Sequence, residues 1–326
     1  MWAVVCERWG GPETLRIIEL TLPEPGPGEV KIRVRAAGVN FPDVLIIQGK
    51  YQVKPELPFT PGAEVAGTVI AVGSGVVSER LRPGARVAAF CSLGGFAEEV
   101  IVPQQACVAL PDGVGFEPAS AFLLAYGTAW HALRDRAVLQ AGETLLVLGA
   151  AGGVGLAAID IGNAMGARVI AAASSPDKLA VCRSYGADAV LDYETEDLRS
   201  GITRLTGGLG PDVVFDPVGD RLTEPAFRSI AWGGRYLVIG FAGGGIPALP
   251  FNLPLLKGAS IVGVFWGGFT KREPERNRDA VSEMLAWIGE GRLRPLVSRT
   301  YGLDDVPQAL TDMAARHVVG KVVIVP

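Results

Sequence analysis

Residues 145–155 read LLVLGAAGGVG, an apolar run that ends in a cluster of glycines. The apolar part is typical of a buried strand, and apolar residues at helical spacing follow over 154–165. The turn matches the pattern GxGxxG, with Ala150, Gly152 and Gly155 at its three glycine positions. Such glycines let a pyrophosphate approach the backbone and let the helix pack closely on the strand. The stretch predicts a dinucleotide-binding turn; a tight βα turn with glycines for packing alone is the alternative.

Further apolar segments around this turn indicate a parallel sheet. They are short, rich in Val, Ile and Leu, and alternate with helical patterns, as strands buried on both faces of a doubly wound sheet do. The expected strands are 144–149, 168–174, 188–193, 212–218, 235–241 and 260–266. We expect a Rossmann dinucleotide-binding domain over residues 123–266.

The two ends of the chain have a different character. Residues 1–122 hold short alternating strands, such as 30–35, with frequent Pro and Gly at turns, which predicts a β-rich domain. After residue 266 the pattern predicts one helix near 278–290 and a final strand at 321–326, too little to fold alone. We therefore expect 267–326 to return to the first domain, in a chain of the α/β class.

Composition excludes several functions. The chain has 326 residues, of which 49 % are hydrophobic. Its formal net charge is −4, so it lacks the excess of basic residues with which proteins bind nucleic acid or an anionic membrane. No apolar stretch is long enough to span a membrane. The first apolar segment carries Glu7 and Arg8, unlike a signal peptide, and the four scattered cysteines form no CxxC. We expect a cytoplasmic protein with no nucleic-acid or membrane partner.

The sequence offers few ligands for a metal. A catalytic zinc site takes about three protein ligands, mostly Cys, His and acids. The only histidines are His131 and His317, and neither has a cysteine nearby in sequence. We therefore predict no metal site.

The end of the second predicted strand bears on the choice of dinucleotide. NAD enzymes usually carry an Asp or Glu about 20 residues beyond the glycines, and no acid stands at this strand end. Ser174 and Lys178 suit a 2′-phosphate, which predicts NADPH. Two alternatives stay open: Lys178 can be a solvated helix residue, and Asp177 can favour NAD, although Pro176 before it indicates a helix start.

Several blocks together resemble the zinc-free medium-chain dehydrogenases/reductases of the quinone oxidoreductase (zeta-crystallin-like) group. The resemblance covers essentially the whole chain, and its blocks are 36–43, 48–51, 58–67, 150–155, 212–219 and 235–241 through 252–266. Ala63 stands where the zinc alcohol dehydrogenases of the wider family have a histidine ligand. Their four-cysteine structural zinc lobe is also absent.

The resemblance implies a GroES-like catalytic domain, 1–122 with 267–326, and a Rossmann domain inserted between its halves, with NADPH bound between the two. The implied cofactor contacts are Asn40 and Thr128 at the nicotinamide end, Ala150, Gly152, Gly153, Val154 and Gly155 at the pyrophosphate, Ser174, Lys178 and Tyr193 around the 2′-phosphate, and Phe241 and Phe265 along the cleft. The group also implies a homodimer through the edge of the Rossmann sheet, where the apolar segment 260–266 is the candidate edge strand.

The activity that this resemblance implies is NADPH-dependent reduction of a quinone. A quinone accepts a hydride without strong Lewis-acid help, so positioning in a dry cleft is the main requirement. The candidate catalytic residues are Asn40, Asp43 and Tyr51. The Tyr51 phenol, with an ordinary pKa near ~10, can donate a proton to an enolate. Purely structural roles are the alternatives: packing for Tyr51, helix capping for Asp43 and turn formation for Asn40.

Two other functions remain compatible with the sequence. The first is reduction of an enone or a 2-enoyl thioester, as in related reductases with a similar segment in which the tyrosine is the proton donor. A CoA or carrier-protein thioester would be met by basic residues, for which the candidates are Lys50, Lys54, Lys271 and Arg272. The second is a non-catalytic, crystallin-like NADPH-binding protein.

Overall fold

The computed structural model describes residues 1–326, and the chain divides into two compact units. The first unit is Met1–Leu124 with Val281–Gly289 and Pro295–Pro326; the second is Ala125–Ala280 with Glu290–Arg294. Residues 267–280 and 290–294 thus cluster with the second unit, whereas the sequence-based boundaries put them in the first domain. Those domain boundaries stay a prediction.

The second unit is built on a six-stranded parallel sheet. Its order is β10 (Ala189–Asp192), β9 (Arg168–Ala173), β8 (Thr144–Val147), β11 (Val213–Asp216), β12 (Arg235–Val238) and β13 (Ser260–Gly263). Every pairing is parallel, and the chain runs outward from β8 in one direction and from β11 in the other. This confirms the doubly wound sheet. The strands end earlier than expected, because their last predicted residues already belong to the turns that leave the sheet.

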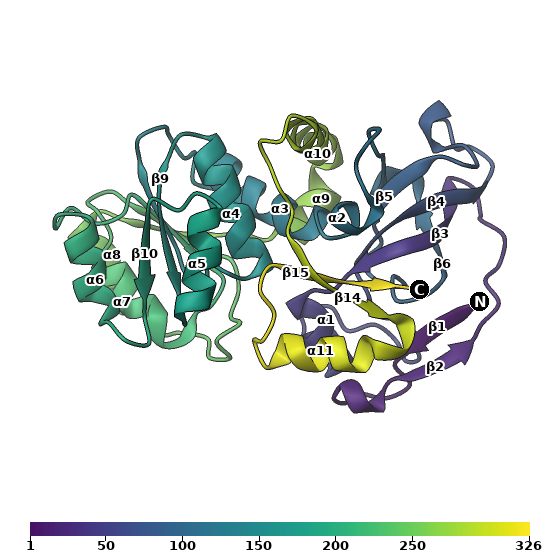
Figure 1. Ribbon diagram of the computed structural model, residues 1–326, viewed down its shortest axis with the longest axis horizontal. Helices are drawn as coiled ribbons and strands as arrows, with labels where there is room; N and C mark the ends of the chain where they lie inside the picture. The colour runs from purple at the N-terminus through teal and green to yellow at the C-terminus, as the bar shows by residue number, and fades with distance from the viewer. The chain divides into compact units, whose positions relative to one another are not determined.

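Helices cover this sheet on both faces. Figure 1 shows α4 (Gly153–Ala164) and α5 (Pro176–Ser184) on one side of the strands, and α6 (Leu198–Leu205), α7 (Thr223–Arg228) and α8 (Asn252–Lys257) on the other. The predicted start of α5 is confirmed: Ser175 is its N-cap and Pro176 its first residue. The order of strands reverses between β8 and β11, and ligands of such sheets bind beyond the carboxyl ends of the strands at that point.

The first unit contains a seven-stranded sheet and a separate two-stranded pair. The sheet runs β14 (Val297–Gly302), β15 (Lys321–Val325), β3 (Glu29–Gly38), β4 (Glu64–Val72), β5 (Arg86–Phe90) and β7 (Cys107–Ala109), with β6 (Glu99–Pro103) also on β3; the pair is β1 (Trp2–Val5) with β2 (Arg16–Glu19). The core is apolar, as the alternating pattern of 30–35 predicts, and α1 (Phe41–Ile47) packs against it. Figure 1 shows β3 from the N-terminal part of the chain beside β15 from its C-terminal end.

The C-terminal part holds more structure than expected. One helix and one strand were predicted after residue 266, but the structure has α9 (Trp266–Arg272), α10 (Pro274–Gly289), β14, α11 (Val306–Ala314) and β15. The missed strand β14 has the sequence VSRTYG, whose polar residues obscure the alternation of apolar and polar positions. The missed helix α11 is only nine residues long. Two further short α-helices lie before the parallel sheet in the sequence, α2 (Phe116–Ser120) and α3 (Leu123–Trp130), and α3 continues into a π-helical segment, His131–Arg136. None of the helices combines the length and the apolar character needed to cross a membrane.

Candidate functional site

The glycine turn after β8 is shaped by contacts with backbone atoms. A Cβ on Gly155 would lie 2.6 Å from the carbonyl oxygens of both Gly149 and Ala150, so any side chain there would push the helix away from the strand. A Cβ on Gly152, the N-cap of α4, would meet only the Gly149 oxygen, at 3.4 Å. The open side of Gly152 and the N–H groups of the first helical turn fit an approaching phosphate.

A hydroxyl and an ammonium meet at the end of the next strand. Lys178 Nζ donates to Ser174 Oγ at 3.2 Å, and both residues follow β9. Tyr193 follows the neighbouring strand β10, whose last residue, Asp192, pairs with Ala173. The structure therefore brings together the three residues that the resemblance implies for a 2′-phosphate, at the sheet edge that also carries the glycine turn.

Asp216, at the carboxyl end of β11, was not singled out from the sequence. Its carboxylate is buried and accepts four hydrogen bonds, from the N–H groups of Val218 and Gly219 and the hydroxyls of Thr223 and Tyr236. The loop that it holds lies against the glycine turn, because a Cβ on Gly149 would come within 2.6 Å of Val218 Cγ2. An acid that ends an apolar strand, as in VVFD, is the signal that could have revealed this role.

The other predicted cofactor contacts of the second unit are spread over three elements. Thr128 lies on α3, Phe241 in the loop after β12, and Phe265 immediately before α9. The Phe265 side chain is 57 % exposed, which is unusual for a phenylalanine and leaves it available to a ligand.

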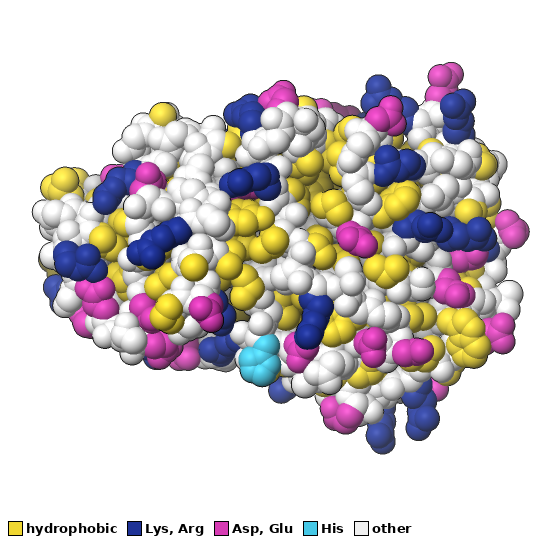
Figure 2. Space-filling model, viewed as in Figure 1, with side chains coloured by type: hydrophobic (Ala, Val, Ile, Leu, Met, Phe, Trp, Pro, Cys, Tyr) yellow, Lys and Arg dark blue, Asp and Glu magenta, His cyan; other side chains and the backbone are white.

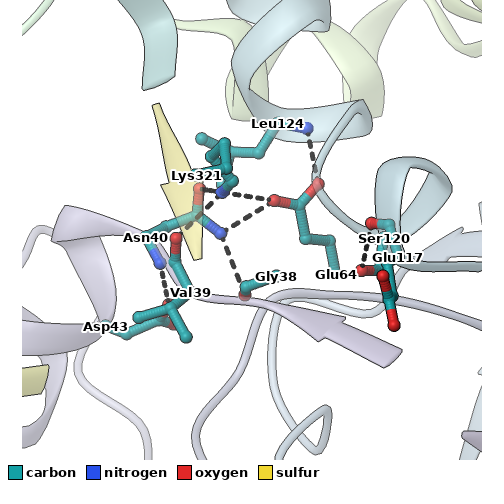
Figure 3. A network of polar contacts seen from close by, with 9 residues as sticks. All are labelled: Gly38, Val39, Asn40, Asp43, Glu64, Glu117, Ser120, Leu124 and Lys321. Carbon is teal, nitrogen blue, oxygen red and sulfur yellow. Dashed lines mark hydrogen bonds and ion pairs between the residues drawn. The ribbon is translucent and has the colours of Figure 1, made fainter. Parts of the chain in front are cut away.

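In the first unit, strand register assembles a buried polar cluster at the end of β3 (Figure 3). Gly38 pairs with Glu64 of β4 on one side and with Val323 of β15 on the other, which brings the segments around residues 40, 64 and 321 together. Lys321 Nζ donates to Val39 O at 2.9 Å, to Glu64 Oε1 at 2.8 Å and to Asn40 Oδ1. We call Asn40, Glu64 and Lys321 the Asn40 cluster.

Glycine at position 38 is a condition of this arrangement. A Cβ there would lie 2.6 Å from Glu64 Oε1 and 2.3 Å from the Ser120 carbonyl oxygen. The other Glu64 oxygen, Oε2, accepts the N–H of Leu124 at 2.9 Å (Figure 3). Neither Glu64 nor Lys321 was predicted as a functional residue; a charge at the first position of an apolar strand, as in KVVIV, is the only local signal.

Asp43 is tied to the start of α1. Its carboxylate accepts the Asn40 N–H at 2.7 Å, and its own N–H donates to the Asn40 carbonyl oxygen, which is the capping role considered from the sequence. Burial raises the pKa of Asp43 to about 7, despite hydrogen bonds and the nearby Lys321 charge that lower it. At physiological pH, the protonated and the ionised form of the Asp43 carboxyl group are therefore both populated.

Tyr51 is half buried beyond the end of α1 and packs against the core of the first unit. Its hydroxyl makes no hydrogen bond within the chain. Burial, and secondarily the Asp43 charge, raise the pKa of the phenol, so it stays protonated over the physiological range. A protonated, unpaired hydroxyl can donate to a ligand, so the geometry is compatible with both roles considered for Tyr51.

Two family models match the chain. The alcohol dehydrogenase GroES-like domain matches residues 26–112, and the zinc-binding dehydrogenase model matches residues 153–288. The quinone oxidoreductase-like protein 2 homolog of Nematostella vectensis is 40 % identical over 99 % of this chain and 88 % of its own length. A quinone oxidoreductase of Pseudomonas aeruginosa is 36 % identical over 98 % of this chain and 97 % of its own length.

The chain belongs to the medium-chain dehydrogenase/reductase family, in its quinone oxidoreductase group. A solved structure of Escherichia coli quinone oxidoreductase complexed with NADPH superimposes with a TM-score of 0.94 at 28 % identity and covers 100 % of both chains. These matches confirm the family and the GroES-like plus Rossmann fold class expected from the sequence. The protein is therefore an oxidoreductase of this family.

Although one model of the family is described as zinc-binding, this member has no cluster of metal ligands. No group of three or more His, Cys, Asp or Glu side chains is placed to hold a metal ion. Ala63 precedes Glu64, and the carboxylate of Glu64 already accepts hydrogen bonds from Lys321, Asn40 and Leu124.

On the face shown in Figure 2, basic and acidic side chains are interspersed, and no large basic patch is present.

Proposed function

We propose that this oxidoreductase uses NADPH to reduce a quinone, or a similar activated carbonyl acceptor, by hydride transfer without zinc. The observation that carries the proposal is the Ser174–Lys178 pair beside a glycine turn that fits a pyrophosphate. The similarity to the E. coli quinone oxidoreductase, which was solved with NADPH, supports the choice of cofactor. The names of the P. aeruginosa and N. vectensis relatives support the choice of acceptor class.

In this proposal the second unit holds the phosphates of the cofactor. The turn from Ala150 to Gly155, with the N–H groups of Gly153 and Val154, receives the pyrophosphate at the positive end of α4. Lys178 and Ser174 bind the 2′-phosphate with a charge-assisted and a neutral hydrogen bond, and Tyr193 flanks them. Asp216 keeps the loop after β11 in place against this turn.

The nicotinamide end is assigned to Asn40 and Thr128, with Phe241 and Phe265 as apolar neighbours. When bound, NADPH supplies the hydride. The residues of this chain then orient the reacting groups and exclude water, which is the main catalytic requirement for an acceptor whose reduced form is aromatic. Asp43 acts indirectly, because it caps α1 and so fixes Asn40 at its start.

The proposed zinc independence rests on the side chains that could act as zinc ligands. Glu64 is the acid nearest to Ala63, and its oxygens are both engaged by donors of the protein itself. The charge of Lys321, 2.8 Å from Glu64 Oε1, further disfavours a second cation there.

One observation favours a second candidate function, the reduction of an enone or a 2-enoyl thioester. The Tyr51 hydroxyl is protonated and has no partner in the chain, as a proton donor requires. A carbon–carbon double bond needs a proton after hydride transfer, whereas the oxygens of a reduced quinone can take protons from water. The two functions therefore differ in their demand on Tyr51.

The activity assay compares three acceptors in parallel: a simple benzoquinone, an enone and an enoyl-CoA, each with NADPH and with NADH. The proposal expects the highest kcat/KM with the quinone and NADPH. Turnover of the enoyl-CoA alone would replace it by the second function. Tight NADPH binding without oxidation by any acceptor would indicate the non-catalytic binding protein.

We also propose that the protein is a homodimer formed through β13. This strand ends the sheet, since it pairs only with β12, and its Ile261 is exposed. Next to it, Phe251, Leu255 and Leu256 on and before α8 are 91 %, 79 % and 65 % exposed. A second copy, related by a two-fold axis, would pair the edge strands and cover this apolar surface on both protomers at once.

The dimer is tested by light scattering after size-exclusion chromatography. Leu255→Glu is expected to yield monomers, because it places a charge in the apolar surface. Val77→Glu is the control, since Val77 is 84 % exposed but belongs to the first unit. A wild-type monomer at micromolar concentration would contradict the proposal.

A further inference from the structure

Arg221 contacts the segment that follows β10, although it lies in the loop after β11. Its Nη2 donates to Glu194 Oε1, and its guanidinium lies over the Tyr193 ring, with 5.7 Å between Cζ and the ring centroid. In the order of the sheet, β9 and β8 stand between β10 and β11. The contact therefore bridges the carboxyl ends of the two strands that lead into Ser174 and the glycine turn.

The backbone that carries Arg221 is fixed on both sides. Before it, Gly219 and Asp220 have positive φ angles of 68° and 52°, which are uncommon for a residue with a side chain such as Asp220. The Asp220 N–H donates to the Gly245 carbonyl oxygen at 3.1 Å. After it, Leu222 is buried. Because such a conformation costs free energy, its presence motivates a functional hypothesis for the side chain that the loop presents.

The Arg221 guanidinium has donors to spare. Of the five N–H groups of an arginine, only one on Nη2 is engaged here, and the side chain is 58 % exposed. By contrast, Arg204 on α6 uses Nε and Nη2 in three hydrogen bonds to both oxygens of Glu196. The Arg221–Glu194 pair is thus an open contact, and its guanidinium can bind a further acceptor.

The charge of a 2′-phosphate exceeds what Lys178 supplies. Near neutral pH a phosphate monoester carries a charge of about −1.5 to −2, whereas the Ser174–Lys178 pair provides one ammonium and a neutral hydroxyl. Tyr193, the third residue assigned to this phosphate, is the ring under the Arg221 guanidinium. An arginine presents parallel N–H groups that match two phosphate oxygens, so Arg221 can supply both the second charge and further hydrogen bonds.

We propose that Arg221 is the second cation of the 2′-phosphate site and that it exchanges the Glu194 carboxylate for the phosphate when NADPH binds. The inference rests on the proposed function, in which Ser174 and Lys178 bind this phosphate. All of these residues belong to the second unit. A dinucleotide without the 2′-phosphate leaves the Arg221–Glu194 pair in place, so Arg221 determines specificity for NADPH over NADH.

The test compares NADP⁺ with NAD⁺, which differ only in the 2′-phosphate. Dissociation constants are measured by calorimetry on the intact protein. Arg221→Met removes the charge and keeps an apolar side chain. It is expected to weaken the binding of NADP⁺ by about 10- to 150-fold, the factor for a charge-assisted hydrogen bond, and to leave that of NAD⁺ unchanged. Arg221→Lys keeps the charge without the parallel N–H groups, so it should lie between the two.

Glu194→Gln separates a binding role from a purely structural ion pair. In this variant the phosphate no longer has to displace a carboxylate, and a negative charge beside the site is removed. NADP⁺ should therefore bind several-fold more tightly than in the wild type, with the affinity for NAD⁺ unchanged. A purely structural pair predicts the opposite, because both substitutions would then break the same contact.

Arg204→Met is the matched control. It removes the arginine of another exposed Arg–Glu pair in the same unit, with hydrogen bonds only to Glu196. The preference for NADP⁺ over NAD⁺ should stay at the wild-type value. The Tm of each variant reports whether the fold is intact.

Opposite shifts of the NADP⁺ affinity in Arg221→Met and Glu194→Gln support the inference. Equal weakening of both dinucleotides in Arg221→Met overturns it, because Arg221 would then contact the adenine or shape the loop. Unchanged or weaker binding of NADP⁺ in Glu194→Gln also overturns it, and this isosteric variant decides the question even where Arg221→Met fails to fold.

The same measurements separate this inference from the proposed function. If Lys178→Ala abolishes the preference for NADP⁺ while Arg221→Met leaves it unchanged, the inference fails and the proposed phosphate site stands. A wild type that binds NAD⁺ as tightly as NADP⁺ would overturn the proposed choice of cofactor itself.

Discussion

The glycine turn after β8 and the Asn40 cluster at the end of β3 are built in opposite ways. The turn is made of consecutive residues whose backbone forms the site, and its glycines keep side chains out. The cluster is made of side chains from three segments, and Lys321 is separated from Glu64 by 257 positions. Local chemistry decides the first site, whereas the register of β15, β3 and β4 decides the second.

This difference predicts different responses to substitution. A backbone site is sensitive to an added atom where the chain is closely packed, as at Gly155, but it contains no titratable group. A side-chain cluster depends on charge, protonation and the completeness of its hydrogen bonds. Substitutions in and near the two sites can therefore separate steric from electrostatic sensitivity.

The largest effect is expected in the turn, for Gly155→Ala. Its methyl group would lie 2.6 Å from two backbone oxygens, so the start of α4 must move away from β8. We expect a lower Tm and no measurable NADPH binding in calorimetry. Gly152→Ala is the matched control: its Cβ meets only one atom at 3.4 Å, so the Tm should hold while NADPH binding weakens. Equal Tm losses in both variants would contradict the distinction.

The next effect concerns Tyr51, which lies beyond α1 in the first unit. Tyr51→Phe removes the unpaired hydroxyl and should lower kcat with an enone or an enoyl thioester by about 10²–10⁴-fold, the usual contribution of a general acid. The same change should matter far less with a benzoquinone. Equal losses with both acceptors would mean that Tyr51 shapes the site, and no loss with either would leave it a packing residue.

The third prediction concerns Asp43, whose protonation should change the free energy of unfolding. Its pKa is raised from 3.8 to about 7, so the folded protein holds the proton more tightly than the unfolded chain. The stabilisation of the folded protein that comes from this tighter proton binding is complete below about pH 4, and it is lost as the pH rises toward 7. The free energy of unfolding of the wild type should therefore fall relative to Asp43→Asn over that range, by up to about 4 kcal/mol.

Urea denaturation of both proteins at several pH values measures this difference. The variant keeps an oxygen for the Asn40 N–H, so the cap of α1 is retained. A difference that does not change between pH 4 and pH 7 would show that Asp43 stays ionised in the fold.

A smaller effect is expected at the other end of the cofactor. Lys178→Ala removes a charge-assisted hydrogen bond of about 1.5–3 kcal/mol, which corresponds to a KM for NADPH raised roughly 10- to 150-fold. The KM for NADH should change little. Arg199→Ala, at an exposed position of α6, is the control for a lost surface charge. A wild type that prefers NADH would refute this assignment of Lys178.

The smallest effect is expected from removal of metal. No cluster of His, Cys, Asp or Glu is placed to hold an ion in either unit, so dialysis against a chelator should leave quinone reduction unchanged. Stoichiometric zinc in the purified protein, lost together with activity, would contradict zinc independence.

The elements that the sequence predicted well are those with strong local patterns. The strands of the parallel sheet and the start of α5 at Ser175 and Pro176 could be located because buried strands are uniformly apolar and helix caps are specific. The polar strand β14 and the short helix α11 carry weak patterns and were missed. The ends of the parallel strands were placed too late, because apolar residues continue into the turns.

The sequence by itself determined the doubly wound sheet, the glycine turn after β8 and the proximity of Ser174 and Lys178, since each depends on residues close together in the chain. Only the tertiary structure decided that Lys321 meets Glu64 and Asn40, that Asp216 holds the loop against Gly149, and that Asp43 is buried enough to raise its pKa. The reason is physical: a turn is specified by the φ/ψ preferences of its own residues, whereas a buried charge is specified by what the sheet register places beside it.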